Sequence, residues 1–204
     1  MAANPNTPNG LQTVYNSSLG PTKETAYYID NAQAAMGIGT PVKLLAGTNS
    51  SSVIFGKEWP AGSLKKIQVA TGGDGVGIIG AITRFEQNVT QIMPTTGSYN
   101  PANTEMVAYV ADAPEQEFTI VTDGGTFTSS YIGLNANLTI GTVNAFTGID
   151  STSLDTTTPA ATSTFQLKIL RLNPSPLNDL ANTYQELVVQ INNHQLANIT
   201  TGVE

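Results

Sequence analysis

Short apolar runs, interrupted at regular intervals by turn residues, limit this chain to few fold classes. From Pro41 onward, runs rich in Val, Ile, Leu and Phe end in clusters of Gly, Pro, Asn, Asp or Ser, as in "PVKLLA" before "GTNSS" and "LKKIQVA" before "TGGDG". Runs of this length and spacing are typical of β-strands joined by tight turns. The sequence therefore predicts an all-β fold, a β-sandwich or β-barrel of short antiparallel strands.

The composition agrees with this prediction. Only 11% of the residues are charged, whereas an average soluble domain has about 25%. Neutral polar residues, chiefly Thr and Asn, must therefore supply most of the polar surface. Thr is branched at Cβ and suits a pleated surface better than a helix interior.

Two segments near the C-terminus carry specific structural predictions. In residues 165–172 ("FQLKILRL") the apolar and polar residues alternate and the pattern then inverts at Leu170, which indicates a β-bulge or burial of both faces. Residues 177–191 fit either an amphipathic helix or a loop followed by a strand at Tyr184–Asn192. The β-branched cluster favours the strand, which we expect to pair with the 165–172 segment.

The N-terminal region differs in composition from the rest. Residues 1–22 are rich in Asn, Pro, Ser and Gly, so we expect residues 1–39 to form an extended N-terminal arm with little regular structure. Residues 40–204 should form a β-rich domain. The first ten residues lack the features of a secretory signal, and no apolar run approaches the ~18 residues of a membrane span.

The charge pattern argues against two classes of partner. The net charge is −7, and the eight Lys and Arg residues are scattered, with Lys65 and Lys66 the only adjacent pair. Without a basic stripe we expect no nucleic-acid partner and no docking on an anionic membrane. The absence of cysteine excludes disulfides and thiolate metal sites.

Two long segments, residues 87–104 and 124–149, contain no charged residue. A neutral segment of this length in a soluble protein is either half-buried or a contact surface. Because interface cores are depleted in charged residues, burial in a partner is one explanation.

Gly75–Gly80 ("GVGIIG") matches the GxGxxG spacing of dinucleotide-binding loops. Such a site requires a following helix and an acidic residue about 20 positions on, whereas "VGIIGAITRF" alternates like a strand. The alternative interpretation, which we favour, is a hairpin at "TGGDG" leading into a glycine-containing strand.

Two further features, besides the histidine described below, are candidates for chemistry. Asp112, Glu115 and Glu117 surround Pro114, but their spacing does not match a calcium loop, and a solvated turn is the favoured interpretation. Trp59 either stacks on a ligand or partner, or covers a turn at the rim of the core.

His194 is the only histidine in the chain. It follows an expected strand, no G-x-S-x-G motif is present, and a zinc site would have no second nitrogen donor. We expect His194 to lie at the strand end and to hydrogen-bond through one ring nitrogen, and we predict no catalytic, cofactor-binding or metal-binding residues.

The order of several segments resembles the small decoration (cement) proteins of tailed bacteriophage heads. The likeness covers roughly residues 40–196 and depends mainly on "ADAPEQEFTI" and "VVQINNHQ". The resemblance implies a β-rich structural virion protein without a cofactor, which is made in the host cytoplasm and coats the outside of the head.

The expected function is therefore non-enzymatic: binding to the major capsid protein and stabilisation of the phage head, as a homo-oligomer that the family resemblance suggests is a trimer. Residues 1–22 would act as a tether across neighbouring capsomers. The alternatives are a head-fibre or receptor- or glycan-binding adhesion module, and a hydrolase on a β scaffold.

Overall fold

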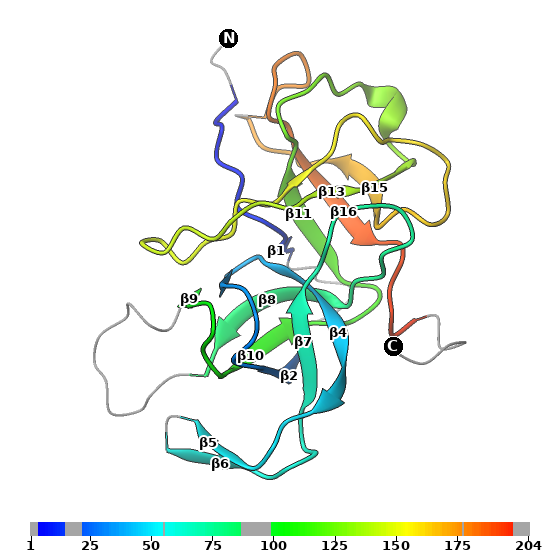
Figure 1. Cartoon of the computed structure of the whole chain (residues 1–204). Helices are drawn as coiled ribbons and strands as arrows, with labels where there is room; N and C mark the ends of the chain where they lie inside the picture. Colours follow the sequence, from blue (N-terminus) through cyan, green and yellow to red (C-terminus); the bar gives the residue numbers. More distant parts are fainter. Residues whose placement is uncertain (1–3, 15–21, 55, 87–98, 177, 198–204) are drawn as a thin grey trace.

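The computed structural model describes residues 4–14, 22–54, 56–86, 99–176 and 178–197. Within these residues the protein is built from strands, and the one helical element is the 3-10 turn η1 (Ser129–Tyr131). The predicted all-β class is confirmed. Figure 1 shows a closed barrel in the lower half of the molecule and an open sheet in the upper half.

The barrel contains five strands in the order β10-β2-β7-β4-β8, and β8 closes on β10. The β2–β7 pair is parallel and the other pairs are antiparallel. Its buried side chains form one apolar cluster, which includes Ile29, Val42, Ile67, Ile82 and Val107. The strand bounds are β2 (Glu24–Ile29), β4 (Pro41–Thr48), β7 (Lys65–Val69), β8 (Gly80–Phe85) and β10 (Met106–Ala111).

The open sheet has the order β1-β11-β16-β15-β12, and all its pairs are antiparallel. Alternate residues of its long strands point into one core, including Phe118 and Ile120 of β11 and Leu187, Val189 and Ile191 of β16. The strand bounds are β1 (Gln12–Thr13), β11 (Glu117–Val121), β12 (Asn135–Ala136), β15 (Leu167–Leu172) and β16 (Glu186–Ile191).

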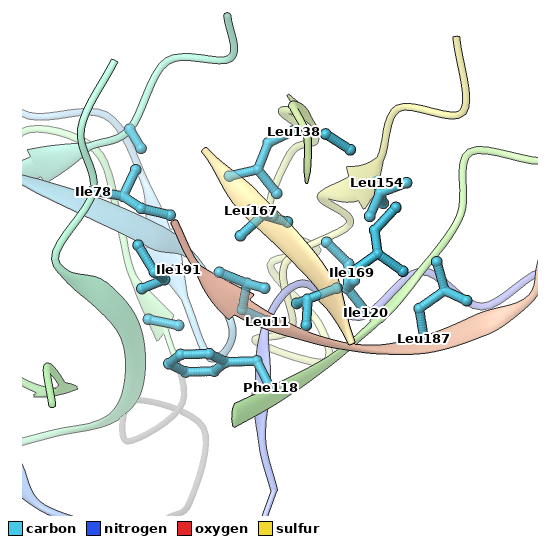
Figure 2. Close-up of a cluster of buried hydrophobic side chains, with 14 of the residues drawn as sticks. Leu11, Ile78, Phe118, Ile120, Leu138, Leu154, Leu167, Ile169, Leu187 and Ile191 are labelled. Carbon is cyan, nitrogen blue, oxygen red and sulfur yellow. The ribbon is translucent and has the colours of Figure 1, made fainter. Parts of the chain in front are cut away.

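This core also joins the sheet to the barrel. Ile78, Ala81 and Ala111 come from the end of the barrel and belong to the same buried cluster as the sheet residues. In Figure 2, Ile78 lies on the barrel side of the cluster and faces Ile191 of the sheet. The two halves therefore share apolar burial, which is the main stabilising term of a fold.

Three two-stranded pairs complete the structure: β3 (Met36–Gly37) with β9 (Tyr99–Asn100), β5 (Ser52–Ile54) with β6 (Lys57–Trp59), and β13 (Leu138–Thr139) with β14 (Ser153–Leu154). The β5–β6 pair extends from the lower end of the barrel (Figure 1).

Both C-terminal predictions are confirmed. The register of the β15–β16 pair shifts between Ile169 and Arg171, which agrees with the β-bulge, one of the two alternatives given for Leu170. Residues 186–191 form the strand β16, not a helix, and β16 pairs with β15 as expected.

The predicted N-terminal arm is wrong in part. Glu24–Ile29 is a barrel strand whose last three residues are buried, so the domain begins well before residue 40. Residues 4–14 are extended, as expected, but they pack on the protein itself: Leu11 is buried in the sheet core, and the Asn4 side chain exchanges two hydrogen bonds with the Asp179 backbone. Residues 1–3 and 15–21 of the expected tether lie outside the described residues.

The hairpin expected at "TGGDG" is also wrong. The strands on either side of it, β7 and β8, do not pair with each other, because β4 lies between them and pairs with both. The segment between them instead crosses one end of the barrel, where Ile78 joins the shared core.

Candidate functional site

His194 lies where the open sheet meets the barrel. It follows β16 and forms a parallel bridge with Ile78: the Ile78 N–H donates to the Asn193 carbonyl at 3.0 Å, and the Gln195 N–H donates to the Ile78 carbonyl at 3.1 Å. The Leu196 N–H donates to Nδ1 of the imidazole at 3.1 Å. The expected role at a strand end, with a hydrogen bond through one ring nitrogen, is confirmed.

The His194 side chain is buried, and a carboxylate lies near it. Its exposed fraction is 1%, and Nε2 has no hydrogen-bond partner within the described part of the chain. The nearby Asp112 carboxylate accepts hydrogen bonds from the hydroxyls of Tyr27 (2.7 Å) and Thr25 (3.0 Å). Burial raises the pKa of Tyr27, with a further contribution from Asp112. A general base must reach its substrate, and this imidazole is enclosed.

Acidification should destabilise the protein through His194. Burial lowers the pKa of the folded imidazole, and the opposing effects of Asp112, of the Ile79 backbone and of Glu115 are weaker. The unfolded chain keeps the ordinary pKa of about 6.5 and therefore binds the proton first. His194 should thus leave the free energy of unfolding unchanged above about pH 6.5 and lower it progressively from there to the folded-state pKa.

Urea unfolding at about pH 7.5 and about pH 5.5 measures this effect. The control is His194→Asn, which keeps a short acceptor near the Leu196 N–H but cannot titrate. The variant should be less stable overall and lose less stability between the two pH values. An equal loss in both proteins would contradict the prediction.

The glycine motif Gly75–Gly80 forms no nucleotide site of the expected kind. Gly75 lies in a turn, and Gly80 begins the strand β8, so no helix N-terminus follows the motif. Phosphate binding by such loops depends on that helix terminus. Of the favoured interpretation, the glycine-containing strand agrees with the structure, whereas the hairpin before it is wrong.

The acidic residues around Pro114 are not a single solvated turn. Only Pro114 and Glu115 are exposed, whereas Asp112 is buried and accepts hydrogen bonds from the hydroxyls of Thr25 and Tyr27. Glu117 accepts a hydrogen bond from Arg171 at 2.8 Å on the outer side of the sheet. Among the described residues no group of three His, Asp or Glu side chains is placed to hold a metal ion.

Trp59 covers part of the barrel core and is not a free stacking platform. Its side chain is partly buried against that core, and Nζ of Lys57 lies 4.2 Å from the ring centroid. The same ammonium lies 3.6 Å from a carboxylate oxygen of Glu86. The rim interpretation of Trp59 therefore agrees with the structure.

The most exposed large apolar side chain in the described structure belongs to Phe146. It lies at the tip of residues 142–151, here called the Phe146 loop, which connects β13 to β14 and projects to the left in Figure 1. The exposed fraction of Phe146 is 97%. Its backbone is nevertheless held in place: the Asn144 Oδ1 accepts the N–H groups of Phe146 (2.9 Å) and Thr147 (3.2 Å), and the Gly148 N–H donates to the Asn144 carbonyl (2.7 Å).

The base of the loop is tied to the segment that follows β3. The Ile38 N–H donates to the Gly148 carbonyl at 2.8 Å, and the Asp150 N–H donates to the Ile38 carbonyl at 3.0 Å. Asp150 is buried, and its carboxylate accepts the Thr40 hydroxyl at 2.8 Å and the Thr152 N–H at 2.6 Å. The loop thus presents an apolar tip on a hydrogen-bonded support.

Only part of this site could be predicted from the sequence. The charge-free segment 124–149 indicated either half-burial or a contact surface, but Phe146 was not singled out, because an exposed and a buried phenylalanine look alike in a sequence. The available signal was its position between Asn144 and Gly148, two turn-forming residues. No family model, curated protein or solved structure matches the chain. Within the described residues no helix is long and apolar enough to cross a bilayer.

Proposed function

We propose that this protein is a structural component of a phage head that binds the outside of the major capsid protein shell and stabilises it. The observation that carries this proposal is the position of the charge-free segment 124–149. The segment is largely at the surface: residues around η1, such as Ser129 and Ile132, and the tip of the Phe146 loop are exposed.

Neutral exposed segments of this kind suit a permanent partner. Compared with the rest of a protein surface, the centre of an interface is depleted in charged residues and enriched in aromatic residues. Residues 124–149 combine both properties, since they lack Lys, Arg, Asp and Glu and expose Phe146. When many copies bind to one shell, contacts that are individually weak add up to a stable assembly.

The sequence resemblance to phage decoration proteins supports the same proposal, and the β architecture is compatible with it. The glycan-binding alternative is less well supported. Carbohydrate sites use accessible aromatic faces, and the face of Trp59 lies under the Lys57 ammonium. A histidine-dependent hydrolase is less well supported too, because His194 is enclosed.

A head-binding experiment tests the proposal. Heads assembled from the major capsid protein of the same genome, without this protein, are mixed with the purified chain and sedimented. We expect saturable co-sedimentation, new density on the outer surface in cryo-electron microscopy, and a higher temperature of head disruption. Heads of an unrelated phage serve as the control. A chain that stays in the supernatant with the cognate heads would exclude the proposed function.

A further inference from the structure

We propose that Phe146 is the anchor of this interaction and inserts into an uncharged apolar pocket on the major capsid protein. This inference rests on the proposed function and adds the residue and the chemistry of the contact. Its starting point is the exposure of Phe146, which at 97% exceeds that of the other exposed large apolar side chains among the described residues, Val53 (64%), Ile149 (40%) and Ile132 (39%).

The first argument is energetic. Transfer of a phenyl ring from water to an apolar site lowers the free energy. Aromatic side chains buried in pockets dominate the binding energy of many interfaces. The Asn144 side chain holds the backbone at the tip of the loop through hydrogen bonds from Phe146 and Thr147, and the Phe146 ring is 97% exposed in this conformation. The ring is therefore available to a partner.

The second argument is pre-organisation. Binding costs less when the contact segment already has its bound conformation. Hydrogen bonds from Ile38 and Thr40 fix the base of the loop, and Asn144 fixes its tip. A Cβ added to Gly37 would overlap the Gly148 carbonyl, so the loop also lies directly against β3. The protein thus maintains an ordered loop whose tip serves none of its own buried cores.

The third argument identifies the occupant as a protein pocket. The residues around the tip are uncharged: Thr142, Asn144 and Thr147 are polar, as in the rim of a protein interface, and Ala145 and Ile149 are apolar and exposed. A small-molecule site such as a sugar site is concave, with a few convergent polar groups, whereas the Phe146 ring projects with 97% exposure, Asn144 Oδ1 is used by the loop backbone and Asp150 is buried. An anionic membrane is disfavoured by a net charge of −7 and by a loop without Lys or Arg.

The test compares Phe146→Ser with the matched control Val53→Ser, which removes another exposed apolar side chain at the far end of the barrel. Both variants should keep the melting temperature of the wild type. We expect Phe146→Ser to bind cognate heads about 10-fold or more weakly, Val53→Ser to bind normally, and Phe146→Trp to retain most of the affinity.

The outcomes separate the two proposals. If the wild type fails to bind cognate heads, the proposed function is wrong. If the wild type binds and Phe146→Ser binds equally well, only the anchor is wrong. The choice of occupant would be wrong if Phe146→Ser bound heads normally but selectively lost another interaction of the wild type. The three interactions to measure are binding to a glycan array, binding to phosphatidylcholine–phosphatidylglycerol vesicles, and self-association by sedimentation.

Discussion

Replacing Phe118 with Ala should lower the free energy of unfolding by about 3–5 kcal/mol. Phe118 has no exposed surface and lies on β11 between its neighbours β1 and β16. In Figure 2 its ring points toward the barrel side of the cluster and lies near Leu11. Truncation removes most of a buried aromatic side chain and leaves a cavity that the surrounding strands cannot fill, because their registers are fixed by hydrogen bonds.

Urea unfolding followed by circular dichroism measures the change, with Val53→Ala as the control. Val53 is largely exposed, so its truncation should alter the stability by no more than about 0.5 kcal/mol. Equal effects of the two substitutions would contradict the placement of Phe118 in the core.

The same experiment examines the cooperativity of the fold. Because the core around Phe118 includes Ile78 and Ala111 from the barrel, disruption of the sheet core should weaken the barrel as well. A single transition is therefore expected in the wild type and in Phe118→Ala. Two separate transitions, with only the first shifted, would show that the sheet and the barrel unfold independently.

Local sequence patterns predicted much of the secondary structure. The strand β16 and its pairing with β15 followed from alternating apolar residues, and the bulge at Leu170 followed from the inversion of that alternation. Such features are local, since side-chain direction in a strand depends only on position along the chain.

The topology was less accessible, because pairing partners are chosen by the whole fold. The parallel β2–β7 contact joins residues near positions 28 and 66, and a turn signal such as "TGGDG" does not report that β4 separates β7 from β8. For the same reason residues 24–29 looked like part of an arm, although tertiary burial makes them a barrel strand.

The candidate site was likewise predictable only where its features are local in the sequence. The structural role of His194 was predictable from its position after a strand and from its lack of chemical partners in the sequence. The burial of Asp112 by hydroxyls from β2 was not, because Tyr27 and Asp112 are far apart in the chain. The exposure of Phe146 depends on where Ile38 places the loop, which is again a non-local property.

Replacing Gly80 with Val should destabilise the protein by about 3 kcal/mol or more. Gly80 begins β8, pairs with Val42 of β4, and lies so close to β10 that an added Cβ would overlap the Ala111 carbonyl oxygen. The obstacle is backbone and cannot rotate away, so β8 and β10 would have to separate where the barrel closes.

The matched control is Gly75→Asn in the same motif, because Gly75 has a left-handed φ that Asn tolerates and open space around it. Denaturant unfolding should show near-normal stability for Gly75→Asn and a marked loss for Gly80→Val, with Gly80→Ala intermediate. If Gly75→Asn were the more damaging of the two changes, the last glycine of the "GVGIIG" motif would not serve barrel closure.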